Sequence, residues 1–335
     1  MKIKNKNEYP LSSKRGFALL VLILLVSVLL ALRYGSADMD LKSFVLALTG
    51  NPLNDSDSVI LYMVRMPRIL AAVLSGIGLS LSGVLLQTVT DNSLAGPNII
   101  GVNAGAGFAV VCTLAFFPLL FGVLPLCAFV GAFGATVLIV FLAESGNRSK
   151  SSVVLAGVAV TALFNALISA FTLINTDILS SFNSFSIGGF SGITSDRLMI
   201  PAIIIGICLF VGLLISPKLN TLCLGDHYAA SLGVPVRMVR FAAIVCASAS
   251  AAAVVSFAGL LGFVGLIVPH IARRLVGYKL KPLICASALI GATVTTLADL
   301  IGRVLAAPSE IPVGIMMAFI GAPFFIHLLV RSREA

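Results

Sequence analysis

Two arginines, Arg65 and Arg68, stand three residues apart where a polar segment meets a long apolar run, in the stretch VRMPRILAA at positions 64–72. A guanidinium is permanently charged and offers five N–H donors in a planar fork, so its chemistry is the binding of carboxylates and phosphates. The spacing leaves two interpretations open: a site for an acidic partner, or pairing with lipid headgroups or with acids of the same chain. Asp299 and Arg303, four residues apart, are interpreted as an ion pair on one helical face.

The sequence contains no pattern typical of catalysis or of a metal centre. It has no His, Cys, Asp and Glu group with metal-ligand spacing, no G-x-S-x-G motif and no G-x-x-x-x-G-K-[ST] phosphate loop. The six cysteines are scattered and are interpreted as small apolar side chains. His270 is interpreted as a histidine that bonds a backbone carbonyl. The chain is therefore predicted to be no enzyme and to hold no metal or other cofactor.

The composition indicates a membrane protein. Apolar residues make up 59% of the 335 residues and charged residues only 10%, against about 25% charged residues in an ordinary soluble domain. So few charges cannot cover the surface of a soluble protein, which means that lipid must cover much of it. No basic patch alternates with aromatic residues, as a nucleic-acid groove requires. We therefore expect an all-α polytopic membrane protein that does not bind nucleic acid.

The apolar runs predict about ten membrane-spanning helices within a single transmembrane domain, residues 1–335. The predicted spans are residues 16–33, 67–90, 98–117, 120–143, 152–174, 198–216, 240–258, 262–276, 282–302 and 311–330. The first span follows a basic tail (1–15) and is interpreted as an uncleaved helix rather than a signal peptide. The larger connections are the outer segments 34–64, with a short helix around 40–48, and 175–197, and the inner loop 217–240.

The basic residues set the orientation. With the N-terminus in the cytoplasm, sixteen of the 22 lysines and arginines lie on the cytoplasmic side, in agreement with the positive-inside rule, and both termini are cytoplasmic. Arg65, Arg68 and Arg303 then lie outside. Because these arginines oppose the general bias, topology does not explain them.

The predicted spans carry small residues rather than charges. No carboxylate stands at mid-membrane, where an ion-coupled carrier keeps the ligands of its coupling ion. Gly76, Gly78 and Gly83 punctuate the second span, and Gly101 and Gly105 open the third. Small residues let helices approach closely, so we expect dense helix packing.

Four motifs follow one another from about residue 60 to the end of the chain. They are RMPRILAAVLSGIGLSLSGVLLQTVTDNSLAGPNIIGVNAGAG (65–107), LGDHYAASLGVPV (224–236), GFVGLIVPHIAR (262–273) and ADLIGRVLAAPSEIPVGIMMAFIGAPFFIHLL (298–329). Together they resemble the FecCD-type permeases of type II ABC importers, which carry iron–siderophore complexes, haem and vitamin B12. The resemblance implies a ten-helix permease in the bacterial cytoplasmic membrane. It also implies four partners: a second permease copy, two cytoplasmic ABC ATPase subunits that bind the ATP and Mg, and an external substrate-binding protein.

The resemblance also implies roles for individual residues. Three arginines match a docking site for carboxylates of the binding protein: Arg65, Arg68 and Arg303. Part of the inner loop matches the segment that couples to the ATPase: Leu224, Gly225, Asp226, Tyr228, Ala229, Leu232, Gly233 and Val234. Four residues match the inner gate: Asn92, Leu94, Ser151 and Ser152. The sequence departs from the family pattern at Ser93, where Pro is common, and at Lys150, where a small polar residue is usual.

Two other classes of protein stay open as alternatives. An ion-coupled secondary transporter would work without an ATPase partner, but it is disfavoured by the lack of mid-membrane carboxylates. A multi-span membrane enzyme is disfavoured by the lack of a catalytic constellation.

Overall fold

The computed structural model describes residues 11, 13–35, 40–49, 54–98, 100–145 and 150–332. Within these ranges the regular structure is entirely helical. The predicted basic tail lies largely outside the described residues, as do the side chains of Lys150 and Ser151.

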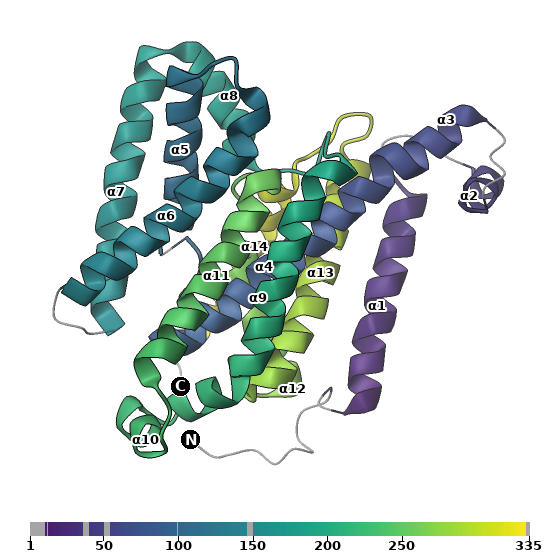
Figure 1. Ribbon diagram of the computed structural model, residues 1–335. Coiled ribbons are helices and arrows are strands. Elements are labelled where there is room, and N and C mark those ends of the chain that lie inside the picture. Colours follow the sequence, from purple (N-terminus) through teal and green to yellow (C-terminus); the bar gives the residue numbers. More distant parts are fainter. Residues whose placement is uncertain are drawn as a thin grey trace.

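Each of the ten predicted spans corresponds to a helix (Figure 1). These helices are α1 (Lys14–Arg33), α4 (Met66–Thr90), α5 (Val102–Phe116), α6 (Leu124–Ser145), α7 (Lys150–Ile174), α9 (Ser195–Leu222), α11 (Val236–Ala258), α12 (Val264–Val276), α13 (Leu280–Leu305) and α14 (Val313–Ser332). Among the described residues, seven helical stretches are long and apolar enough to cross a bilayer. The prediction of an all-helical, multi-span protein is confirmed.

The connections contain more helix than the sequence predicts. The short helix expected around 40–48 is present as α2 (Leu41–Leu48). Residues 55–65, predicted as loop, form α3 (Asp55–Ser58) and the π-helical segment η2 (Val59–Arg65), which continue into α4 as one helical stretch of 36 residues. The outer segment 175–197 contains α8 (Thr176–Ile187), whose first turn is capped by the Asn175 side chain. The polar helices α3 and α8 escape a hydropathy pattern, which detects spans. The segment η2 (VILYMVR) is apolar, and it ends at Arg65, directly before the predicted start of the second span at residue 67.

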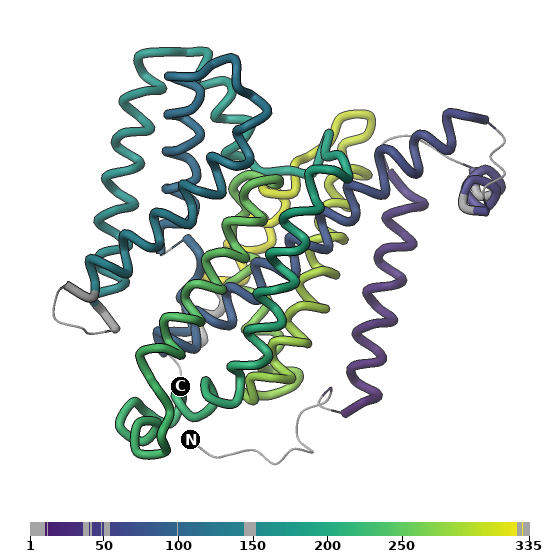
Figure 2. The backbone as a smooth tube through the Cα atoms, in the orientation of Figure 1, coloured from purple at the N-terminus to yellow at the C-terminus, as the bar shows by residue number. Residues whose placement is uncertain are grey.

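The helices surround α4, which runs through the middle of the molecule and contacts α9, α11, α12 and α13 (Figure 2). Helices α5 to α8 form a group to one side that α6 joins to α11, and α1 packs against α13. The inner loop contains α10 (Asp226–Ser231), and α1 begins at the same end of the bundle (Figure 1). The connection between α13 and α14 lies at the other end, as does α3. This arrangement agrees with the predicted alternation of inner and outer segments.

Glycines allow the backbones of the central helices to touch. A Cβ atom on Gly76 would overlap the Gly291 carbonyl of α13, and one on Gly83 would overlap the Gly265 carbonyl of α12. Gly105 of α5 meets α6 in the same way. Hydroxyl groups reinforce these contacts: Thr295 Oγ1 donates to Ala72 O at 2.7 Å, across the interface between α13 and α4. The dense packing expected from the small residues is confirmed.

The variant Gly76→Ala is expected to lower the free energy of unfolding by about 1–3 kcal/mol, because a methyl group at this contact forces the backbones of α4 and α13 apart. Thermal unfolding of the purified protein in detergent measures the change. Gly206→Ala in α9 is the matched control, since a Cβ atom there meets no atom within 4 Å. Equal melting temperatures for the two variants would contradict the packing role of Gly76.

Candidate functional site

A buried charged cluster lies at the predicted outer end of the bundle. Arg68, in the first turn of α4, donates from Nε and Nη2 to the Asp299 carboxylate of α13 at 2.9–3.1 Å. Its Nη1 donates to Glu310 Oε2 at 2.6 Å. Asp299 is only 1% exposed, whereas the Glu310 side chain, in the connection before α14, is 26% exposed. Arg68 therefore joins three segments of the chain through charge-assisted hydrogen bonds.

Arg303 completes the cluster. Its Nε lies 3.1 Å from Asp299 Oδ2, which confirms the ion pair predicted from the four-residue spacing. Its Nη2 donates to the Ala31 carbonyl of α1 at 3.3 Å. The carboxylate of Asp299 is thus held between two guanidinium groups. Two positive and two negative side chains (Arg68 and Arg303, Asp299 and Glu310) balance within the cluster, which lowers the cost of burying them.

Arg65 fixes the end of α1. Its Nη1 donates to the carbonyls of Leu32 and Arg33 at 2.6 and 2.8 Å. The last carbonyls of a helix lack intrahelical partners and carry the negative end of the helix dipole, so a guanidinium is a well-suited partner for them. Gly35 lies against the guanidinium groups of both Arg65 and Arg303, and a side chain at this position would crowd them. Arg65 and Arg303 together hold α1 against α4 and α13.

The three predicted docking arginines therefore lie close together, buried, with partners in their own chain. Of the two interpretations left open by the sequence, intramolecular pairing describes their contacts, and the docking role stays a prediction. The sequence gives no signal for Glu310 as a partner of Arg68 or for the carbonyls of α1 as partners of Arg65. Arg68 and Glu310 are 242 positions apart in the sequence, and Arg65 is 33 and 32 positions from the two residues whose carbonyls it binds.

A cavity of about 490 Å³ opens beside the cluster. Arg68 and Glu310 form part of its wall, and aromatic rings form another part: Phe185, Phe190 and Phe257. Gly188 and Gly189, directly after α8, line it with backbone. The Arg68–Glu310 pair is the part of the charged cluster that an anion from outside the chain can reach.

The predicted coupling segment lies at the opposite end, in and around α10. Leu224, Tyr228 and Leu232 are 66–70% exposed, although they are large apolar side chains. Gly225 and Gly233, at the two ends of α10, adopt positive φ angles of 110° and 77°, which suit glycine. Ala229 of α10 is fully buried, and Val234 is half-buried. Three exposed apolar side chains thus lie in and directly beside a short, well-defined helix.

An ion pair connects this segment to the bundle. Arg240 Nη2, in α11, lies 2.9 and 3.0 Å from the two carboxylate oxygens of Asp226, the first residue of α10. The pair is partly exposed, so it contributes little to stability and serves mainly to orient α10 relative to α11. The pair is thus a second connection between α10 and α11, besides the short segment of chain that joins them.

Two of the residues predicted for the inner gate, Asn92 and Leu94, follow α4 directly. Asn92 Oδ1 accepts from the Leu94 amide at 2.9 Å, which closes a tight turn after the left-handed residue Asp91. Ser152 lies half-buried in the first turn of α7, and Ser151 lies outside the described side chains. Their gating role stays a prediction.

The sequence assigns no role to the buried Gln87, yet this residue links α4 to α12. Gln87 Nε2 donates to Gly265 O at 3.2 Å, and Gln87 Oε1 accepts from Arg273 Nη1 at 2.6 Å. The connection fixes the last turn of α4, directly before the predicted gate.

The prediction for His270 is wrong. Its ring packs edge-on against Phe324 at 5.9 Å, and its Nε2 is buried without a hydrogen-bond partner in the described part of the chain. A proline at 269 and an apolar neighbour on α14 determine its surroundings, and no carbonyl comes within reach of Nε2. The described residues contain no group of three or more His, Cys, Asp and Glu side chains that could hold a metal ion.

Removing the charge of Asp299 with Asp299→Asn is expected to cost about 3–5 kcal/mol of unfolding free energy, because two buried guanidinium groups lose their shared carboxylate. Glu310→Gln is expected to cost about 1 kcal/mol or less, since Glu310 is partly exposed. Thermal unfolding in detergent measures both, and Asp40→Asn, at an exposed position of the outer segment, serves as the control. An Asp299→Asn variant as stable as the control would show that the cluster is not structural.

Comparison with known proteins gives a consistent result along the whole chain. The model of the FecCD transport family matches residues 23–331. The Fe(3+)-citrate import system permease protein YfmE of Bacillus subtilis is 35% identical over 329 residues, which cover 98% of this chain and 97% of that protein. The hemin transport system permease protein HmuU of Yersinia pestis is 34% identical over 326 residues, covering 95% and 96% of the two chains.

Solved structures agree. An inward-facing structure described as a metal-chelate type ABC transporter has a TM-score of 0.85 and 30% identity, and the match covers 95% of this chain and 100% of that one. PsaBC from Streptococcus pneumoniae in complex with Fab has a TM-score of 0.60 at 19% identity, covering 81% and 92%, which is a likeness of fold. The resemblance carried by the four motifs is thus confirmed over nearly the full length: the chain belongs to the FecCD transport family.

Proposed function

We propose that this chain is the membrane-spanning permease subunit of an ATP-driven importer for a metal chelate of the iron–siderophore, haem or vitamin B12 kind. It works in the bacterial cytoplasmic membrane as a pair of identical permeases with two cytoplasmic ABC ATPase subunits and an external substrate-binding protein. ATP and Mg bind to the ATPase subunits, and the chelate passes along the axis of the permease pair.

The observation that carries this proposal is the similarity to import permeases for ferric citrate and hemin over almost the whole chain. The two ends of the molecule support it. One end carries guanidinium groups beside an open cavity, and the other carries exposed apolar side chains in and around α10. An importer driven by separate subunits needs a contact surface at each end of the permease and needs no phosphate loop of its own.

At the inner end, Leu224, Tyr228 and Leu232 insert into a groove of the ATPase subunit. Large apolar side chains that stay exposed beyond the membrane mark a surface for a protein partner. The movement of the ATPase subunits reaches the bundle through α10, which packs against α9 and is linked to α11 by the Asp226–Arg240 pair. A rigid-body displacement of α11 then opens the inner gate after α4.

Transport into proteoliposomes tests the function. With the ATPase subunits inside and the loaded binding protein outside, uptake of the chelate is expected to require ATP and to stop with vanadate. Uptake is expected to continue when ionophores collapse the proton and sodium gradients. Uptake that survives vanadate and stops with the ionophores would replace this proposal by the alternative, an ion-coupled secondary transporter.

At the outer end, Arg68 receives a carboxylate of the binding protein, and Glu310 holds the same guanidinium until the binding protein arrives. Glu310→Gln removes this internal competitor and is therefore expected to tighten docking about five-fold, since a partly exposed ion pair contributes up to about 1 kcal/mol. Binding of the loaded binding protein to the permease in nanodiscs measures the affinity.

Asp196→Asn is the control for the docking experiment. It also removes one exposed negative charge at the outer end, and it leaves the partners of Arg68 in place. A gain confined to Glu310→Gln supports docking at Arg68. Unchanged or weaker docking of Glu310→Gln, with wild-type stability, would contradict it.

A further inference from the structure

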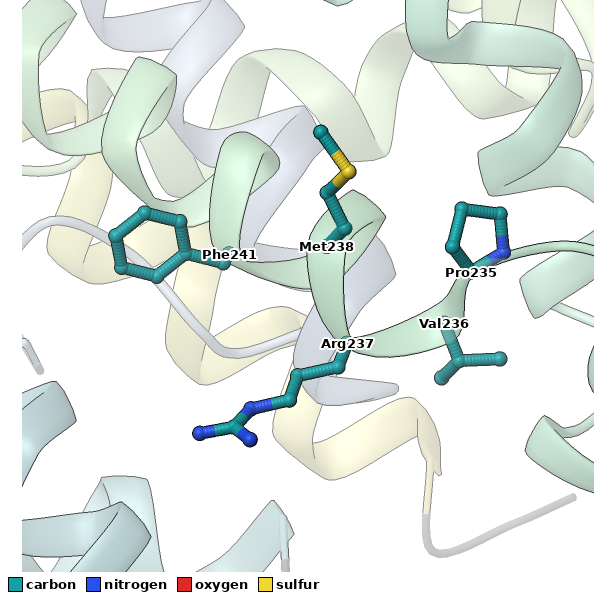
Figure 3. A pocket seen from close by; sticks show the side chains of 5 residues that line it. All are labelled: Pro235, Val236, Arg237, Met238 and Phe241. Atoms are coloured by element: carbon teal, nitrogen blue, oxygen red, sulfur yellow. The ribbon is translucent and has the colours of Figure 1, made fainter.

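Two hollows on the surface of the bundle meet at Phe241, near the start of α11. The first, of about 550 Å³, is lined by residues 235–238 and Phe241 (Figure 3). The second, of about 170 Å³, is a crevice between α6 and α11, lined by Phe241, by three further residues of α11 and by five residues of α6. Both contain Phe241, so the two hollows are neighbours and together mark a path that starts at the inner end of α11 and runs along the helix.

The path follows one face of each helix. On α11 the lining residues have helical spacing: Arg237, Phe241, Ile244, Val245 and Ser248. In Figure 3 the side chains of Arg237 and Phe241 extend to the same side of α11. The facing residues of α6 also have helical spacing: Phe133, Thr136, Val137, Val140 and Phe141. The crevice is thus a groove between two parallel stripes.

The crevice offers its occupant almost nothing but apolar surface. Its two hydroxyl groups already donate to carbonyls of the protein: Ser248 Oγ to Ile244 O at 2.8 Å, and Thr136 Oγ1 to Ile100 and Ala132 O at 3.3 Å. A helix, about 10 Å wide with its side chains, is too large for this space. A single hydrocarbon chain has the shape and the chemistry that the crevice accepts.

The length of the path matches one leaflet of a bilayer. Arg237 and Ser248 are eleven residues apart on α11, which corresponds to about 16 Å at 1.5 Å per residue. Half of a hydrocarbon core about 30 Å thick is about 15 Å. An acyl chain that starts beside Arg237 therefore ends near Ser248.

The charge at the entrance selects the headgroup. Arg237 is exposed at the inner end of α11, which the predicted orientation places at the level of the headgroups of the inner leaflet. Its guanidinium has five N–H donors, so it can bind a phosphate while it also contacts the protein. Basic residues at this level attract anionic lipids. We propose that an anionic phospholipid of the inner leaflet binds here, with its phosphate at Arg237 and one acyl chain in the crevice between α6 and α11.

The protein contains no tryptophan, so a single introduced tryptophan reports on its own surroundings. Phe141→Trp places the reporter in the wall of the crevice, and Phe210→Trp, on the exposed face of α9, is the matched control. The permease in nanodiscs is compared with phosphatidylglycerol and phosphatidylcholine whose acyl chains carry bromine, which quenches tryptophan fluorescence. Brominated phosphatidylglycerol is expected to quench the Phe141→Trp reporter at about five-fold lower mole fraction. The two lipids are expected to quench the Phe210→Trp reporter equally.

The headgroup contact is tested in the same background. Arg237→Gln is expected to abolish the preference for phosphatidylglycerol at Phe141→Trp. Arg274→Gln, which removes another exposed positive charge at the inner end, is expected to preserve it. The quenching of the Phe210→Trp reporter shows whether each variant is correctly folded.

Three results would overturn the lipid site. One is equal quenching by both lipids at Phe141→Trp, and another is a preference that survives Arg237→Gln. The third is a preference that disappears when the ATPase subunits are added, because the hollow at Arg237 would then be covered by protein. None of these results depends on transport, so the lipid site and the proposed function are tested separately.

Discussion

Lipid tails solvate an apolar helix as well as a neighbouring helix does, so helices in a membrane must be held together by contacts that lipid cannot offer. In this protein such contacts converge on α4. Gly76 and Gly83 bring its backbone against α13 and α12, and carbonyl groups of α4 accept hydrogen bonds from hydroxyl groups of its neighbours, as Ala72 O does from Thr295. The arrangement of the helices that surround α4 follows from its position.

The charged cluster obeys the same constraint at the outer end. Asp299 is shared by the guanidinium groups of Arg68 and Arg303, and both Arg303 and Arg65 donate to the last carbonyls of α1. Each partner satisfies a group that would otherwise be buried without a hydrogen bond. Glu310 differs from the others because it is partly exposed and borders a cavity. Structural stability therefore depends on the buried part of the cluster, and a contact with another molecule can form at its exposed margin.

Local patterns in the sequence predicted what local chemistry determines. Hydropathy locates the ten helices, seven of which are long and apolar enough to cross a bilayer within the described residues, and four-residue spacing identifies the Asp299–Arg303 pair. The exposed apolar residues in and around α10 are recognisable in the sequence because a solvated loop rarely contains large apolar side chains such as Leu224, Tyr228 and Leu232. The sequence could not reveal that Arg68 meets Asp299, 231 positions away, or that Arg65 caps α1, because these contacts depend on how α1, α4 and α13 pack. For the same reason, a groove between α6 and α11 is visible only after the two helices are placed side by side.

The helical stretch from Asp55 to Thr90 is continuous over 36 residues. Arg68 lies near the outer end of α4, and the turn at Asn92 follows its inner end, about 36 Å away at 1.5 Å per residue. A rigid rod of that length converts a tilt of about 10° at one end into a displacement of about 6 Å at the other. The π-helical segment η2, whose turns of backbone are wider, lies on the outer side of the cluster. The cluster holds this stretch on the inner side of η2, so a displacement of α13 at Asp299 acts directly on the regular helix that leads to Asn92.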